Sequence, residues 1–279
     1  MILTHTTPDT RNAPVIALHS SASNGGQWAT LANDLEGRFC IHAPNLPGYG
    51  KNSLTVDASE TGLASAASAV IAEILQHNRP VHLIGHSNGG AIALKVAMLR
   101  PDLIKSLALY EPCMFHLLRN GDQTDKDLFA EITAISDALT AGCSVGDPEP
   151  GMRSFLDFWN GTGSWDRLPD NAKRKFSAIA ASVVSDFTRM FGEDWDIDQL
   201  KGLTMPTLFL MGMDSPQIAQ RITGLVCNAI PGAQLALLPG LGHMAPVTDP
   251  KWVNLRLFDH IAKAERSATR CFWPLRTAA

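Results

Sequence analysis

A single serine flanked by glycines offers the clearest chemistry in this sequence. It lies in the segment GHSNG (85–89), between an apolar run at 81–85 and a small-residue stretch at 89–100. The pattern fits an ordinary turn between a strand and a helix, and it also fits the strained bend that exposes a serine nucleophile. The second interpretation explains both glycines, because side chains there would collide with the neighbouring strand or helix. We therefore predict that Ser87 is a nucleophile at a helix N-terminus, where developing negative charge is favoured.

His243 is the candidate base for this serine. A serine hydroxyl is a weak nucleophile until a neighbouring base takes its proton. His243 lies in the segment LPGLGHMAP (238–246), directly after the last apolar run, and the glycines and prolines around it indicate a loop. A surface histidine would fit such a loop as well. The chain order of serine first and histidine last favours His243 as the base.

Short apolar runs alternate with helical patterns and would position these residues. Two of the intervening stretches, 63–76 and 89–100, have helical character. The runs are nearly continuous in apolar residues, as is typical of parallel strands that helices cover on both faces. The predicted fold class is therefore α/β, with a mostly parallel doubly wound sheet. The predicted buried strands span residues 15–18, 39–43, 81–85, 106–110, 207–211 and 234–238.

The alternation stops after residue 112 and resumes at residue 201. Helical patterns cover 124–142, 152–165 and 171–191, without a convincing strand between them. A helical insertion at this point predicts a lid over the carboxyl edge of the sheet, where open α/β sheets bind ligands. We expect a core of residues 1–112 and 201–264, an all-helical lid of residues 113–200, and a mobile C-terminal tail of residues 265–279.

Four segments together resemble an α/β-hydrolase-fold serine hydrolase of the esterase and lactonase kind. They are GHSNGG (85–90), LPGLGH (238–243), APNLPGYGKNS (43–53) and HSSASNGGQW (19–28). The resemblance covers residues 15–112 and 201–262 and leaves the predicted lid unmatched in detail. It implies the α/β-hydrolase fold, and it is much less specific for the substrate.

The resemblance also implies an oxyanion hole. In such enzymes the loop after the first long strand usually begins with His-Gly, whereas this chain has His19 and Ser20 there. By position, the donors would be the backbone N–H groups of Ser21 and Asn88, with the Ser21 hydroxyl as a third donor. The serines of this loop would otherwise only form its turn.

Two carboxylates compete for the position beside His243, where an acid would orient the imidazole through Nδ1. Asp214 follows the strand at 207–211, the commonest place for this acid in the family, but it lies one residue closer to Gly212 than in many relatives. Glu111 lies at the tip of the strand at 106–110, where haloalkane-dehalogenase-like relatives place their acid. The resemblance favours Glu111 narrowly and leaves Asp214 as the alternative.

Aromatic residues of the predicted lid would form an apolar pocket over Ser87. Such a pocket leads us to expect hydrolysis of a carboxylic ester or lactone of a small, partly hydrophobic substrate through an acyl-enzyme. A C–C bond hydrolase, an amidase or an acyltransferase would use the same serine and histidine, and a small-molecule receptor with little turnover would share the fold. The residues expected to contact the substrate are Ser20, Phe115, Phe158, Trp159 and Met244.

Composition argues against several other partners. The 279 residues carry a net charge of −4, without a run of five basic residues, so neither nucleic acid nor a membrane is an expected partner. The five cysteines are scattered, which argues against a disulfide framework and a zinc site. We expect no metal and no organic cofactor. The first residues lack the pattern of a signal peptide, and we expect a cytoplasmic protein of undetermined oligomeric state.

Overall fold

Within the described residues, six strands form one parallel sheet in the order β2-β1-β3-β4-β5-β6. The computed structural model describes residues 12–51, 53–56 and 62–270. Because the chain adds β2 on one side of β1 and β3 on the other, the strand order reverses between β1 and β3, which is where such sheets bind ligands. The strands are β1 (Val15–Leu18), β2 (Ile41–His42), β3 (Val81–His86), β4 (Ile104–Tyr110), β5 (Thr207–Gly212) and β6 (Gln234–Leu238).

Helices cover both faces of the sheet. Along β1, Ile16 and Leu18 pack into one hydrophobic cluster, whereas Val15 and Ala17 pack into a second cluster on the opposite face. The first cluster includes α2 (Gly62–Leu75), α3 (Asn88–Leu99) and α8 (Gln217–Ala229), and the second includes α1 (Ala29–Asp34) and α10 (Pro250–Arg270). The shorter helices are α9 (Ala245–Thr248) and the 3₁₀ helices η1 (Gly25–Trp28), η2 (Pro101–Leu103), η3 (Phe115–Leu118) and η4 (Ile197–Gly202).

The predicted α/β fold class is confirmed, and each predicted strand is present. Two strands differ from the prediction in extent or burial. β2 is limited to Ile41–His42. The prediction of a buried strand is wrong for β6, where Leu235 is 41% exposed and Leu237 is 48% exposed. The reason is its position at the edge of the sheet, where β5 is its only partner among the described strands.

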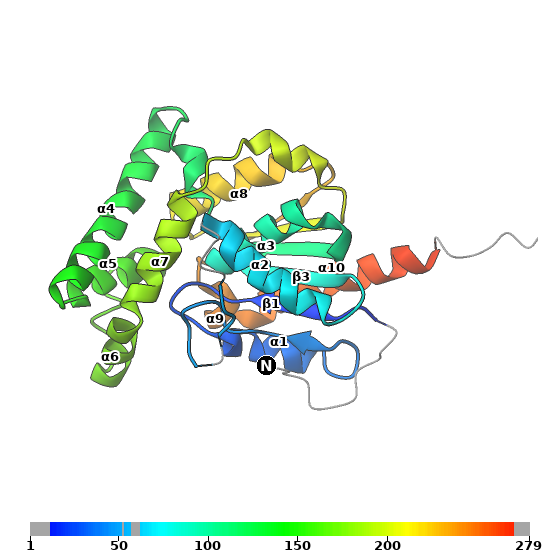
Figure 1. The fold of residues 1–279 in the computed structure, drawn as a ribbon, viewed down its shortest axis with the longest axis horizontal. Coiled ribbons are helices and arrows are strands. Elements are labelled where there is room, and N and C mark those ends of the chain that lie inside the picture. The colour runs from blue at the N-terminus through cyan, green and yellow to red at the C-terminus, as the bar shows by residue number, and fades with distance from the viewer. Residues whose placement is uncertain (1–11, 52, 57–61, 271–279) are drawn as a thin grey trace, which may run out of the picture.

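Four α-helices between β4 and β5 form a helical insertion, and the described residues 113–200 contain no strand. In Figure 1, α4, α5 and α6 lie to one side of the sheet, and α7 lies between them and the core. The single helix predicted over 171–191 is wrong, because the backbone leaves the helical region at Ile179 (φ −107°, ψ 7°). The four helices are α4 (Gln123–Val145), α5 (Glu149–Asn160), α6 (Asp170–Ala178) and α7 (Ala180–Phe191).

Helix α4 is the one helix of the described residues that is long and apolar enough to cross a membrane. Its residues Leu128, Ile132 and Leu139 are instead buried inside the protein. At its first turn, Asp125 forms an ion pair with Arg221 of α8, with 2.7 Å between Oδ1 and Nε. Packing against the rest of the protein therefore accounts for these three apolar residues of α4, whereas 28% of its apolar window as a whole is buried.

The predicted C-terminal tail is wrong for residues 265–270, which continue α10. Glu265 anchors this end of the helix to the sheet. Its carboxylate accepts hydrogen bonds from His82 Nε2 at 2.9 Å, from Lys105 Nζ at 2.6 Å and from the Ala13 N–H at 2.8 Å. These partners are distant in the sequence, so a local pattern could not reveal them. Residues 271–279 of the predicted tail lie outside the described residues.

Candidate active site

Ser87 lies at a strained bend between β3 and α3. Its backbone has φ 57° and ψ −120°, a conformation that residues with a side chain rarely adopt. A Cβ atom at Gly85 would lie 2.4 Å from the carbonyl oxygen of Gly89, and a Cβ atom at Gly89 would lie 2.4 Å from the carbonyl oxygen of His19. Both glycines are therefore required for the bend, which places Ser87 in the wall of a cavity.

His243 connects Ser87 to a buried carboxylate. The loop after β6 places His243 Nε2 3.0 Å from Ser87 Oγ and His243 Nδ1 2.6 Å from Glu111 Oε2. Because a carboxylate accepts, Nδ1 carries the ring proton, and Nε2 accepts from the Ser87 hydroxyl. The Trp159 ring covers the imidazole, with 4.1 Å between the ring centroids. This arrangement can transfer the hydroxyl proton of Ser87 to His243 while Glu111 stabilises the imidazolium.

Glu111, and not Asp214, is the carboxylate beside His243. Glu111 follows β4 with φ 44° and is fully buried. Its Oε1 accepts hydrogen bonds from the Gly212 N–H at 2.7 Å and from the Ser215 hydroxyl at 2.6 Å. The Asp214 side chain is exposed and lies outside this hydrogen-bonded row. Gly212 and Ser215, at and after the end of β5, therefore hold Glu111 in place by hydrogen bonds, and Asp214 from the same segment forms no hydrogen bond with His243.

A second chain of hydrogen bonds links the His243 loop to the loop after β1. Burial, with a smaller contribution from the nearby His243, lowers the pKa of His86 well below its usual value, so His86 is neutral. Its Nε2–H donates to the His243 carbonyl oxygen at 2.8 Å, which leaves Nδ1 to accept from Gln27 Nε2 at 3.1 Å. Gln27 Oε1 in turn accepts from the N–H and the hydroxyl of Ser20.

His86 and Gln27 are site residues to which the sequence patterns assigned no role. The signals that were available are their positions, one beside the serine and the other inside the segment that follows β1. Both side chains hold loops that carry other candidate site residues.

The two expected oxyanion donors come from neighbouring segments. Leu18 at the end of β1 pairs with Gly85 of β3, so the loop of Ser21 lies beside the bend of Ser87, and Asn88 is the first residue of α3. The Ser21 hydroxyl, however, donates to Asp186 Oδ2 of α7 at 2.7 Å. A hydroxyl has one proton to donate. The expectation of a third donor at this hydroxyl is therefore wrong, and only the backbone N–H of Ser21 is available for that role.

A cavity of about 240 Å³ lies over Ser87. Four residues expected to contact the substrate line it, namely Ser20, Phe115, Trp159 and Met244. Phe158 does not line this cavity, because its ring packs edge-on against Trp159 at 4.8 Å and borders a separate depression. Other residues of the wall, which were not predicted from the sequence as substrate contacts, are Cys113, Leu156, Asn160, Phe176, Met190 and Val247.

The helical spacing of one part of this wall was a usable signal. Leu156, Trp159 and Asn160 are three and four residues apart on α5, so they lie on one face of the helix. If Trp159 contacts the substrate, the helical spacing therefore predicts that Leu156 and Asn160 line the same cavity.

Cys113 lies close to the candidate nucleophile. Its Sγ is 3.3 Å from Ser87 Oγ, and its N–H donates to the Ser87 carbonyl oxygen at 3.3 Å. Burial raises the pKa of the Cys113 thiol to about 12. The thiol therefore stays protonated and can donate weakly to Ser87 Oγ, and it is not a competing nucleophile.

Within the described part of the chain, one group of side chains has the composition of a metal site. His42 of β2, Glu73 of α2 and His77 place ligand atoms within 4.8 Å of one another. None of the three lines the cavity over Ser87. The chemistry available to Ser87 therefore does not involve this group.

Several curated proteins similar to this chain have the names of ester hydrolases. The chain is 35% identical over 237 residues to a pimeloyl-[acyl-carrier protein] methyl ester esterase of Pseudoalteromonas atlantica. This alignment covers 81% of this chain and 86% of that protein. It is 34% identical over 106 residues to the lipase LipV of Mycobacterium tuberculosis. This alignment covers 37% of this chain and 38% of that protein. The chain thus spans under two fifths of the length of this lipase.

Solved structures and a family comparison extend the similarity to the whole fold. A thermophilic esterase from Thermogutta terrifontis superimposes with a TM-score of 0.70 over 91% of each chain, at 18% identity, which is evidence for a shared fold alone. The sequence model of the alpha/beta hydrolase family matches residues 15–256. This match includes all six strands, the helical insertion and the loop of His243, and the chain therefore belongs to the alpha/beta hydrolase family.

Proposed function

We propose that this protein is a serine hydrolase that cleaves a carboxylic ester or lactone of a small, partly hydrophobic substrate. The observation that carries the proposal is the hydrogen-bonded row of Ser87, His243 and Glu111, which borders an apolar cavity. The methyl ester esterase that aligns with most of the chain supports the ester class.

The first half of the reaction forms an acyl-enzyme. Ser87 Oγ attacks the carbonyl carbon of the substrate while His243 Nε2 takes the hydroxyl proton. Glu111 accepts a hydrogen bond from Nδ1–H and stabilises the imidazolium. His243 then gives the proton to the leaving alcohol oxygen as the bond from carbon to that oxygen breaks. In the second half, His243 takes a proton from water as the water oxygen attacks the acyl carbon. His243 then returns this proton to Ser87 Oγ as the bond from the acyl carbon to Oγ breaks, which releases the acid and restores the Ser87 hydroxyl.

The negative charge that develops on the carbonyl oxygen needs donors that are already in position. The backbone N–H groups of Ser21 and Asn88 would supply them, and the N-terminus of α3 favours the same charge. Loss of one such donor costs about 10²–10³ in rate. The orientation of the Ser21 loop is therefore as important as the row of side chains.

The cavity limits the size of the substrate. Its volume of about 240 Å³ is below the roughly 300–1,000 Å³ that is common for ligand pockets. Apolar side chains such as Phe115, Phe155 and Met190 form much of its wall, and Ser20 and Asn160 add polar groups. A short acyl chain or a small lactone ring fits these dimensions better than a long fatty acyl chain.

A series of p-nitrophenyl esters of increasing acyl length tests the proposal. We expect a burst of p-nitrophenol from the wild type, fastest with short acyl chains, and no burst from Ser87→Ala. A serine-directed phosphonate should modify the wild type once, and peptide mass mapping should locate the adduct on Ser87.

The outcome also separates the alternative activities. Absence of both turnover and phosphonate labelling would contradict the proposal and leave a small-molecule receptor. Faster Ser87-dependent turnover of amides or of β-diketones than of esters would replace ester hydrolysis by amide or C–C bond hydrolysis.

A further inference from the structure

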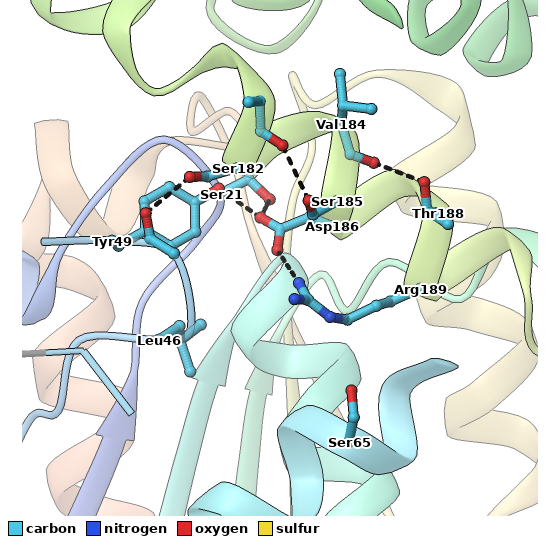
Figure 2. A network of polar contacts seen from close by, with 12 residues as sticks. Ser21, Leu46, Tyr49, Ser65, Ser182, Val184, Ser185, Asp186, Thr188 and Arg189 are labelled. Carbon is cyan, nitrogen blue, oxygen red and sulfur yellow. Dashed lines mark hydrogen bonds and ion pairs between the residues drawn. The ribbon is translucent and has the colours of Figure 1, made fainter. Parts of the chain in front are cut away.

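The proposed mechanism makes no use of one buried carboxylate in the helical insertion. Asp186 of α7 is 1% exposed and lies where α7 meets two loops of the core (Figure 2). Its Oδ2 accepts hydrogen bonds from the hydroxyls of Ser21 at 2.7 Å and Tyr49 at 2.5 Å, and its Oδ1 lies 3.2 Å from Arg189 Nη1. A buried carboxylate is costly unless it is paired and hydrogen-bonded, as this one is.

The contacts of Asp186 hold two consecutive residues of the loop after β1. Ser21 donates to Asp186 directly, and Tyr49 donates to Asp186 while its hydroxyl oxygen accepts from the Ala22 N–H at 3.2 Å. Ala22 has φ 57°, a left-handed conformation that a residue with a Cβ keeps only where its surroundings hold it. A single carboxylate of the insertion therefore fixes the backbone around Ser21.

The core holds the other side of the same loop. Ser20 donates twice to Gln27, which is bonded to His86 beside the nucleophile. Ser20 is thus held from the sheet, and Ser21 and Ala22 are held from α7. The direction of the Ser21 N–H depends on both attachments, because it lies between them.

We infer that Asp186 is a positioning residue of the oxyanion hole, which holds Ser21 and Ala22 so that the Ser21 N–H meets the developing oxyanion. This inference rests on the proposed serine hydrolase function. Asp186 does not line the cavity, so it acts through Ser21 and Tyr49 and not on the substrate. The pairing of Asp186 with Arg189 offsets its negative charge, which would otherwise oppose the charge on the oxyanion.

A second buried carboxylate of the insertion provides a matched control. Asp125 of α4 is 3% exposed and also joins the insertion to the core, through the two hydrogen bonds from Arg221 of α8. Its hydrogen bonds do not reach the loop of Ser21. Loss of Asp125 should loosen the insertion without altering that loop.

The experiment compares Asp186→Ala, Asp186→Asn and Asp125→Ala with the wild type. We expect kcat for a short p-nitrophenyl ester to fall about tenfold or more in Asp186→Ala, with little change in KM, because the lost interaction acts in the transition state. Asp186→Asn should retain part of the rate, because its amide oxygen can still accept from both hydroxyls. Asp125→Ala should keep the wild-type kcat.

Hydrogen exchange of the folded variants gives a readout that does not depend on turnover. The amides of Ser21 and Ala22 should exchange faster in Asp186→Ala than in the wild type, and they should be unchanged in Asp125→Ala. If Asp186→Ala does not fold, Asp186→Asn replaces it in both measurements.

Two results would overturn the inference while the proposed function stands. The first is that the Asp186 variants keep the wild-type kcat and the wild-type exchange rates. The second is that Asp125→Ala loses as much kcat as Asp186→Ala. If the wild type hydrolyses no ester, the proposed function fails instead, and the exchange rates still decide whether Asp186 holds the loop.

Discussion

Two buried carboxylates support different parts of the candidate site, and their partners differ in kind. Glu111 comes from the sheet and accepts from one backbone N–H, one hydroxyl and the ring of His243. Asp186 comes from the helical insertion and accepts from two hydroxyls, with Arg189 as its charged partner.

The difference lies in what each carboxylate joins. Glu111 is held by the end of the adjacent strand and serves one histidine, so sheet pairing determines its place. The partners of Asp186 are side chains from three separate segments of the chain. Burial, opposed by the hydrogen bonds from Ser21 and Tyr49 and by the charge of Arg189, raises the pKa of Asp186 to about 6. We therefore expect the carboxylate of the insertion to titrate at a pH where unfolding can be followed.

The largest expected effect distinguishes Glu111 from its rival in the sequence. Glu111→Gln should lower kcat by about 10⁴, the size of effect known when the triad acid of a serine protease becomes an amide, because the histidine is then held in the wrong tautomer. Asp214→Asn should stay close to the wild type, because the Asp214 side chain is exposed outside the row. Steady-state kinetics measure both, and the reverse pattern would assign the role to Asp214.

The next effect concerns stability and pH at Asp186. The folded carboxyl keeps its proton up to about pH 6, whereas the unfolded one loses it near pH 3.8. The folded state binds more protons between these values, so this group's contribution to stability falls as pH rises from about 4 to 6. A shift of this size corresponds to about 3 kcal/mol. Denaturant unfolding should show this loss in the wild type relative to Asp186→Asn, and parallel curves would contradict it.

A smaller effect tests the support of Glu111. Ser215→Ala removes one of its three donors, and kcat should fall about tenfold, close to the value of one hydrogen bond to a charged group. Ser185→Ala is a suitable control, because that hydroxyl bonds back to the Ala181 carbonyl of its own helix. Equal kcat values for the two variants would show that the Ser215 bond does not support catalysis.

The smallest effect sharpens the account of Asp186. Tyr49→Phe removes a hydrogen bond that favours the charged form, so the pKa of Asp186 should rise further. The upper end of the pH range over which stability falls should then move to higher pH, by less than one unit. The same unfolding series measures it, and an unchanged midpoint would mean that Tyr49 does not stabilise the carboxylate.

Much of the core follows from the sequence alone. Continuous apolar runs indicate buried parallel strands, and glycines on both sides of Ser87 indicate a bend that admits no side chain there. The chain order of Ser87 and His243 was also enough to propose a pair, and the structure brings them together at 3.0 Å. These features depend on local backbone geometry and on periodicity, which a single sequence records.

Contacts between distant segments were decided only by the tertiary structure. The choice of Glu111 over Asp214 depends on which carboxylate contacts His243. Glu111 does so although it lies 132 residues before His243 in the chain. The anchor at Glu265, the attachment of His86 to Gln27 and the link from Asp186 to Ser21 arise in the same way. A side chain's partner across the fold leaves no spacing or periodicity in the sequence, because packing, and not the local backbone, brings the two together.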